Sequence, residues 1–386
     1  MYEKNSGPLF CGIIKPSMIN ANFKKTIIGI LSILISIELL GLDENFSLKN
    51  IKPFELNSVE GKIYKNADLW GKNGTALIFF SNHCKVSQKF QKSISTISNI
   101  WIKHGFKLLV FSPNFEKAIL PDELAYTDVG DSFEEMKKRA SRENYKFPYI
   151  YDGKKQIITK SLDVKITPSA YLFNKFGELT YYGRLGNHDN PNELKSSELN
   201  QAIQRIYNKN YIYSRTKVYG TSVKFEEDMK LVEKVRNRYA QESIYINYGD
   251  EKKLNFYLKQ KTKYPRFFYI WSVYDNKIQT RENLINISTN YKIFRKRGLK
   301  VYTICICEEG EKEIAYEMLK KSQLSALNFY CSSREISELS KLRSSKGFKT
   351  TPFCRVLSGD GKFDYGTNGM IDKSSLKDSF LRMLSK

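Results

Sequence analysis

Residues 75–90, TALIFFSNHCKVSQKF, contain the junction that decides the fold. The apolar run 75–80 predicts a buried strand, and the segment that begins at Lys85 reads as a helix. Cys84 therefore stands where a strand gives way to a helix. Because the N-terminus of a helix carries partial positive charge, it can stabilise a thiolate at that position.

The elements that follow fit the same plan. A second apolar strand, FKLLVF, comes after Gly105, and Thr167-Pro168 precedes the strand SAYLF and a turn around Gly177. A Thr-Pro pair at the start of a strand suits a cis peptide bond beside the cysteine. In this arrangement the proline leaves a strand edge free, so we expect a substrate chain to approach the sulfur there.

The same order of elements occurs again after Pro265. Strand RFFYIW leads to Asp275 and a long helical segment, which is followed by strand LKVYTICI, Thr351-Pro352 and strand FCRVL. The proline of each Thr-Pro pair is nine residues before a turn glycine, from 168 to 177 and from 352 to 361. The chain therefore contains two copies of one β-α-β…Thr-Pro-β-turn-β unit.

This order implies a mixed sheet flanked by helices, which is the thioredoxin fold. We therefore predict an α/β protein of tandem thioredoxin-like domains. Its expected parts are a leader (1–48), a first domain (49–208), a helical linker (209–262) and a second domain (263–386).

The first half resembles the thioredoxin-like redoxin family, which is related to the AhpC/TSA peroxiredoxin-like proteins. The stretch TKVYGTSVKF (216–225) is similar to the tail of this family, where a Gly-Cys pair is usual and Thr221 stands here. The resemblance implies a thiol-dependent redox activity. The other segments that carry it are FFSNHCKVSQKF (79–90), PDELAYTDVGDSFEEMKKRA (121–140), NYKFPYIYDGKKQ (144–156), ITPSAYLFNKFGEL (166–179) and YYGRLGNHDN (181–190).

The second half resembles a secreted or membrane-associated thiol-disulfide oxidoreductase domain. The strand of such a domain usually ends W-x-x-W-C-x-x-C, whereas Asp275 and Ile278 stand here in place of the two cysteines. A dithiol enzyme needs both an attacking and a resolving thiol. We therefore predict that the second domain is catalytically degenerate at this junction.

Cys84 is the predicted attacking thiol, and Ser87 occupies the position of a resolving cysteine. The predicted function is thus that of a monothiol redox protein, which acts on a peroxide or a protein disulfide. The expected partner is an external resolving thiol, either a thioredoxin-like protein or a small thiol, and no cofactor is implied. The predicted site consists of Cys84, Ser81, His83, Ser87, Thr167 and Pro168.

Two observations bear on a peroxidatic role. Ser81 fits the Ser or Thr that peroxiredoxins place three residues before the cysteine, but Leu77 replaces their proline. A peroxiredoxin also needs an arginine near the thiolate, for which Arg139 and Arg184 are both candidates. The alternative is a vestigial cysteine in a non-catalytic interaction protein.

Composition excludes other classes. The 386 residues carry 63 Lys+Arg against 41 Asp+Glu, a net charge of +22, but the basic residues are spread evenly. We therefore predict no nucleic-acid partner, although binding to anionic polymers or lipid headgroups stays an option. With six cysteines and three histidines, the chain suits neither a disulfide scaffold nor a His-rich metal site. The pair Cys305-x-Cys307 favours a core strand over a metal site.

The leader contains one long apolar run, residues 26–42, which Lys24 and Lys25 precede. This charge arrangement is typical of an export signal or a signal-anchor. We expect an exported or membrane-anchored protein that faces outside the cytoplasm. An amphipathic helix that packs on the body of a cytoplasmic protein is the alternative, because Glu38 interrupts the run.

Overall fold

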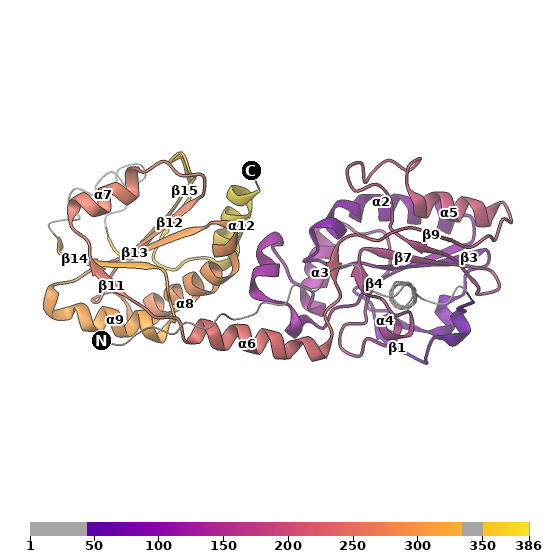
Figure 1. The fold of residues 1–386 in the computed structure, drawn as a ribbon, viewed down its shortest axis with the longest axis horizontal. Coiled ribbons are helices and arrows are strands. Elements are labelled where there is room, and N and C mark those ends of the chain that lie inside the picture. Colours follow the sequence, from indigo (N-terminus) through magenta and orange to yellow (C-terminus); the bar gives the residue numbers. More distant parts are fainter. Residues whose placement is uncertain (1–44, 334–349, 386) are drawn as a thin grey trace, which may run out of the picture. The chain divides into compact units, whose positions relative to one another are not determined.

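The computed structural model describes residues 45–333 and 350–385. Two six-stranded mixed sheets, each flanked by helices, carry the fold (Figure 1). The apolar run 26–42 of the predicted leader lies outside the described residues. Within the described ranges, no helix is both long and apolar enough to cross a bilayer.

The first sheet has three parallel strands, β5, β4 and β3, followed by β7 and β8, which run antiparallel to their neighbours. The short β9 then pairs in parallel with β8. In spatial order the strands are β5 (Tyr149–Tyr151), β4 (Phe106–Ser112), β3 (Gly74–Phe79), β7 (Ser169–Asn174), β8 (Leu179–Gly183) and β9 (Ser214–Arg215).

Helices bury the central strand β3 along its whole length. Its residues Ala76 and Ile78 share an apolar core with Ile94 and Ile97 of α2 and with Ile203 of α5. Apolar residues on successive turns of α2 face this core, as expected for an amphipathic helix. The helices around this sheet are α2 (Lys85–Ile102), α3 (Phe133–Arg142), α4 (Ile157–Ser161) and α5 (Glu198–Tyr207).

The second sheet repeats this arrangement. Strands β14, β13 and β12 are parallel, and β15 and β16 are antiparallel to their neighbours, while β11 extends the parallel edge. In spatial order the strands are β11 (Ile246–Tyr248), β14 (Leu327–Cys331), β13 (Lys300–Ile306), β12 (Arg266–Ser272), β15 (Phe353–Leu357) and β16 (Phe363–Asn368).

The two faces of the second sheet have separate cores. Tyr269 and Cys305 pack with residues of α8, α9 and α12, whereas Ile270, Ile304 and Cys331 lie in the core that contains Leu254 of α7. Alternate residues of a strand point to opposite faces, which explains the division. The helices are α7 (Glu251–Lys259), α8 (Lys277–Phe294), α9 (Lys312–Lys321) and α12 (Lys373–Leu384).

The repeated strand order confirms the predicted fold class of two thioredoxin-like sheets flanked by helices. The peptide bonds Thr167–Pro168 and Thr351–Pro352 are both cis, as their positions suggested.

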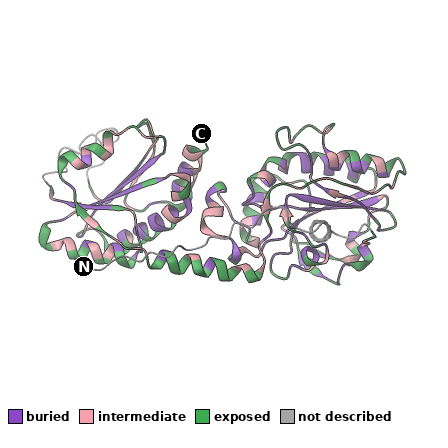
Figure 2. Cartoon of the chain, in the orientation of Figure 1, coloured by how far each residue is buried: buried purple, intermediate pink, exposed green. Residues whose placement is uncertain are grey.

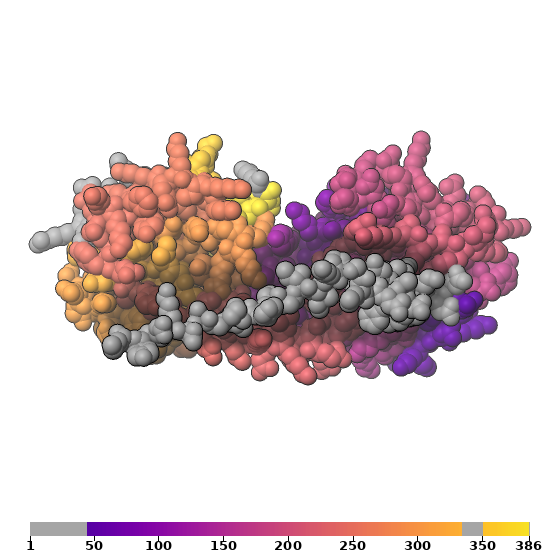
Figure 3. Space-filling model, viewed as in Figure 1, coloured from indigo at the N-terminus to yellow at the C-terminus, as the bar shows by residue number. Residues whose placement is uncertain are grey.

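The segment predicted as a helical linker differs from the expectation. Residues 214–215 belong to the first sheet and residues 246–248 belong to the second, because each pairs with a strand of that sheet. Between them, helix α6 (Met229–Ala240) buries only Val232 and Tyr239. Most of its residues are exposed (Figure 2), and its side chains form part of the visible surface in Figure 3.

Candidate functional site

Cys84 lies at the start of α2, where it caps the helix. Its backbone is extended, and its sulfur accepts a hydrogen bond from the Ser87 N–H at 3.4 Å. The Cys84 S–H in turn donates to the Thr167 carbonyl at 3.2 Å. The side chain is fully buried. The thiol is therefore held between the first turn of α2 and the cis Thr167–Pro168 bond.

Serine and threonine hydroxyls complete the surroundings of this thiol. Ser81 Oγ and Thr167 Oγ1 are 2.8 Å apart, and the Ser81 N–H donates to Ser87 Oγ at 3.4 Å. All three residues are buried. The structure thus brings Ser81, Ser87 and Thr167 together around Cys84, with Pro168 next to Thr167 across the cis bond.

The His83 side chain pairs with a carboxylate that the sequence prediction did not include. Nδ1 of His83 is 2.7 Å from Oδ2 of Asp131, and both side chains are buried. Burial opposes the charged form of His83, but the charge and hydrogen bond of Asp131 outweigh it and raise the pKa of the imidazole. Burial likewise opposes the Asp131 carboxylate, while His83 and Asn114 hold its pKa below the usual value. The pair is therefore stabilised as imidazolium and carboxylate.

Asp131 also fixes the loop that carries the cysteine. Its Oδ1 accepts the backbone N–H groups of Asn82 at 2.6 Å and His83 at 3.2 Å, and Oδ2 accepts Nδ2 of Asn114 at 2.7 Å. Asp131 precedes the capping serine of α3, Ser132. Asp131 lies in the segment 121–140, one of those that carry the family resemblance. Only the folded structure, however, places this segment against His83.

We expect Asp131→Asn to lower the free energy of unfolding by about 3 kcal/mol, because it leaves a buried charge without its partner. The raised pKa of His83 contributes stability fully below its unfolded pKa of about 6.5, and this is lost as pH rises through the folded value. The lowered pKa of Asp131 contributes above its unfolded pKa of about 3.9, and this is lost as pH falls through the folded value. The variant should therefore differ most from the wild type between about pH 4 and 6.5. Urea unfolding across pH measures the difference, and a pH-independent difference would contradict the ion pair.

A segment of the chain itself occupies the strand edge at the cis proline. We call residues 220–224 the strap. Strand β10 (Thr221–Ser222) pairs antiparallel with β6 (Ile166–Thr167), so that Thr221 is opposite Thr167. The Val223 N–H donates to the Lys165 carbonyl at 2.8 Å, which continues this pairing. The expectation of a free edge beside the sulfur was therefore wrong, because this backbone edge is satisfied within the chain.

The end of the strap is anchored at Lys224. Its N–H donates to Asn114 Oδ1 at 2.9 Å, and its carbonyl accepts the Phe115 N–H at 2.9 Å and Gln156 Nε2 at 2.8 Å. Its ammonium is 2.5 Å from Oε1 of Glu123. The Asn114 side chain forms hydrogen bonds with both Asp131 and Lys224. It therefore connects Asp131, which holds the cysteine loop, to the strap.

The two arginines considered for a peroxidatic role have other partners. Arg139 donates to Asp128 and to Thr127, both at 2.9 Å, and Arg184 donates to Glu198 at 2.6 Å. Arg139 is buried, whereas the Arg184 side chain is 40% exposed. In the described parts of the chain, Cys84 forms its hydrogen bonds with Ser87 and Thr167 and not with either arginine, so neither arginine is assigned to the site.

The equivalent junction of the second sheet holds Asp275. Its carboxylate accepts the Thr351 hydroxyl at 2.6 Å and the Ser272 N–H at 2.7 Å. Asp275 thus contacts the threonine of the second cis Thr-Pro through its hydroxyl, whereas Cys84 contacts Thr167 through its backbone carbonyl. A carboxylate cannot undergo thiol-disulfide exchange, so this junction is structural or binding in character.

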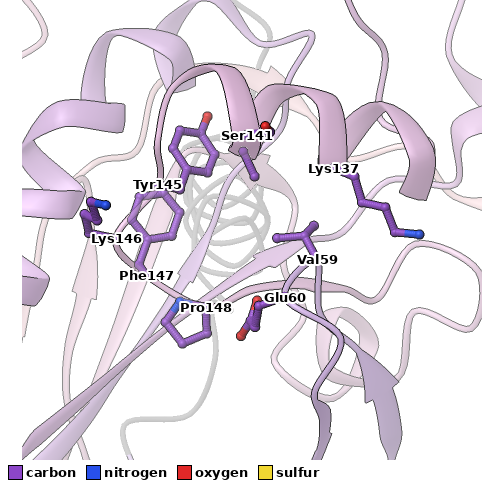
Figure 4. A pocket seen from close by; sticks show the side chains of 9 residues that line it. Val59, Glu60, Lys137, Ser141, Tyr145, Lys146, Phe147 and Pro148 are labelled. Atoms are coloured by element: carbon purple, nitrogen blue, oxygen red, sulfur yellow. The ribbon is translucent and has the colours of Figure 1, made fainter.

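A separate hollow of about 390 Å³ lies on the first domain between α3 and the segment that leads into β5 (Figure 4). Tyr145, Phe147 and Pro148 line it opposite Lys137 and Ser141 of α3. None of the predicted site residues lines this hollow. It therefore gives no access to Cys84.

Comparison with known proteins agrees with this geometry. Residues 48–182 match the model of the AhpC/TSA family. This confirms the resemblance for those residues, which are an AhpC/TSA family domain. No curated protein matches the chain.

Several solved structures are similar to part of the chain. An uncharacterised conserved protein from Geobacillus kaustophilus is 23% identical over 46% of this chain and 90% of its own, with a TM-score of 0.38. A secreted disulfide oxidoreductase from Mycobacterium tuberculosis is 14% identical over 40% of this chain and 97% of its own, with a TM-score of 0.30. The bacterioferritin comigratory protein of Xanthomonas campestris is 14% identical over 40% of this chain and 92% of its own, with a TM-score of 0.31.

Proposed function

We propose that the AhpC/TSA domain is a monothiol redox module in which Cys84 is the attacking sulfur. The observation that carries this proposal is the position of Cys84, which caps α2 and contacts the residue before the cis proline. A cysteine at a helix N-terminus is placed to react as a thiolate.

The proposed substrate is a small peroxide, with a protein disulfide as the second option. Cys84 is fully buried and the strap occupies the neighbouring strand edge, so a folded protein can approach the sulfur only after the strap moves away. A peroxide molecule needs a much smaller opening. The buried site therefore favours the smaller substrate.

The chemistry follows from a single thiol. The Cys84 thiolate attacks one oxygen of the peroxide, the O–O bond breaks, and the leaving alkoxide or hydroxide takes up a proton. The resulting sulfenic acid reacts with an external thiol, which forms a mixed disulfide and releases water. A second external thiol then frees Cys84 and leaves as the disulfide. Ser87 cannot perform this resolving step, which is why an external thiol is required.

The test is to trap the sulfenic acid. Hydrogen peroxide followed by dimedone should label the tryptic peptide Asn73–Lys85, whose single cysteine is Cys84. Peroxide consumption supported by dithiothreitol should fall to the protein-free rate in Cys84→Ser. It should be unchanged in Cys354→Ser, which alters another fully buried cysteine.

An unlabelled Asn73–Lys85 peptide, together with unchanged consumption in Cys84→Ser, would overturn the enzyme proposal. The chain would then be a non-catalytic thioredoxin-fold interaction protein. Export from the cytoplasm stays a prediction from the basic flank and apolar run of the leader.

A further inference from the structure

A groove of about 780 Å³ lies between two helices of the second domain, α8 and α9. Both helices pack on the same face of the second sheet, because Ile287 of α8 and Leu319 of α9 belong to one core. Helix α8 connects β12 to β13 and helix α9 connects β13 to β14, and these three strands are parallel. The two helices therefore run in the same direction, with their N-terminal turns at the same end of the groove.

The two walls of this groove carry opposite charges. Lys277 and Arg281 line it from α8, and Glu313 and Glu317 line it from α9. All four residues are exposed. Within each helix the two charged residues are four positions apart, so they lie on one face. Because Lys277 is the first residue of α8 and Glu313 is the second residue of α9, the cations and the carboxylates occupy similar levels along the groove.

The groove keeps these opposite charges apart within one copy of the chain. Among the residues that the structure describes, no ion pair joins a cation of α8 to a carboxylate of α9. Glu317 is 3.6 Å from Lys320 of its own helix, and both side chains are about half exposed. An exposed pair of this kind contributes little to stability, so Glu317 is free to exchange it for a better partner.

Apolar side chains accompany the two rows of charge. Ile314 and Met318 line the groove from α9, and Ile314 is 52% exposed. On α8, Ile278 and Ile285 are 73% and 44% exposed. Ile278, Arg281 and Ile285 have i, i+3 and i+7 spacing, so they share one face of the helix. Removing this apolar surface from water would favour association with another pair of helices.

We propose that this groove is the interface of a homodimer, in which a second copy of the chain covers it. A two-fold axis along the groove would place α8 of each copy over α9 of the other, at an unchanged level along the groove. Lys277 then faces Glu313 of the other copy and Arg281 faces Glu317 of the other copy, and the symmetry repeats both contacts. The surface is thus complementary to itself, as a two-fold symmetric interface requires.

The remaining charged residue of the groove fits the same arrangement. Lys321 lies one turn beyond Glu317, at the level of Ile285 in the other copy. Its aliphatic stem can pack on that isoleucine while its ammonium group stays in water. Any other partner would have to present carboxylates toward α8 and cations toward α9. The chain itself already presents this pattern, which is why we assign the groove to a second copy.

Sedimentation velocity of the full chain measures the association, in a reducing buffer so that no disulfide joins two copies. The wild type should change from monomer to dimer as its concentration rises to about 100 µM, as expected for a Kd in about the micromolar range. Arg281→Glu brings two carboxylates together at each symmetric contact, and Glu317→Arg brings two guanidinium groups together. Each variant should weaken the dimer at least about a hundredfold, because like charges that face each other across an interface repel strongly.

Mixing the two variants separates this interface from any other. In a dimer of one Arg281→Glu copy and one Glu317→Arg copy, position 281 of each copy again faces an opposite charge at position 317. The equimolar mixture should therefore associate about as tightly as the wild type, which also shows that both variants fold. Lys252→Glu is the matched control and should leave the dimer unchanged. It makes the same change of charge at an exposed residue of α7, which packs on the opposite face of the sheet.

A full chain that stays monomeric at about 100 µM would overturn the proposal and leave the groove to a different partner. A dimer that resists both charge reversals would also overturn it, since another part of the chain, such as the predicted leader, would then hold the copies together. The proposal would equally be wrong if the two variants, both folded by circular dichroism, stayed monomeric when mixed.

Discussion

Thr221→Cys is expected to trap Cys84 in an intramolecular disulfide as soon as peroxide oxidises it. Thr221 is directly opposite Thr167 in the β10–β6 pair, and the Thr167 carbonyl is 3.2 Å from the Cys84 sulfur. Side chains at directly opposite positions have Cβ atoms about 5 Å apart. A sulfur at position 221 would therefore lie beside Thr167, the residue that contacts the attacking thiol.

The expected effect is large because the resolving thiol becomes part of the same chain. Tethered groups have effective concentrations in about the millimolar range, so resolution should be about a thousandfold faster than with a micromolar external thiol. After peroxide treatment, trypsin should release a cross-link between Asn73–Lys85 and Val218–Lys224. The wild type should instead give free peptides and the sulfenic acid adduct.

Ser222→Cys is the matched control for this variant. Adjacent residues of a strand point to opposite faces, so a sulfur at position 222 should point away from the cluster of Ser81 and Thr167. We expect no cross-link in this variant. Equal cross-linking at 221 and 222 would show that the strap does not hold the described register beside Cys84.

The fold was predictable because its strands are long, apolar and repeated. The runs 75–80 and 300–306 are almost continuous apolar segments, as strands covered on both faces must be. The two Thr-Pro pairs and their equal spacing to a glycine then indicated which elements correspond. Local pattern and internal repetition were therefore sufficient for the fold class and for the position of Cys84.

The features that the sequence did not reveal depend on contacts between distant segments. The bond between His83 and Asp131 joins residues 48 positions apart, and the β10–β6 pair joins Thr221 to Thr167. Strands β10 and β6 have only two residues each, too few for an alternating pattern to be recognised. Likewise, Cys305-x-Cys307 has the pattern of a core strand, and only the structure shows that Cys307 reaches a pocket.

Gly220→Ala is expected to open the strap and expose Cys84. A Cβ atom at position 220 would lie 1.9 Å from the Thr167 carbonyl oxygen, and the φ angle of +155° is one that residues with side chains rarely adopt. Because backbone atoms cannot give way as a flexible side chain can, the closed state should lose about 3 kcal/mol. A factor of ten corresponds to about 1.4 kcal/mol, so the open fraction should rise about a hundredfold.

The measurement is the rate at which N-ethylmaleimide alkylates Cys84 in the folded protein, read from the peptide Asn73–Lys85. Gly61→Ala is the control, because Gly61 also has positive φ, at +89°, but nothing lies within 4 Å of its Cβ position. If Cys84 is alkylated through opening of the strap, only the variant at position 220 should react faster. Equal rates in the wild type and Gly220→Ala would mean that another part of the structure controls access to the thiol. Because a peroxide needs a much smaller opening than N-ethylmaleimide does, Gly220→Ala should raise the rate of sulfenic acid formation by a smaller factor.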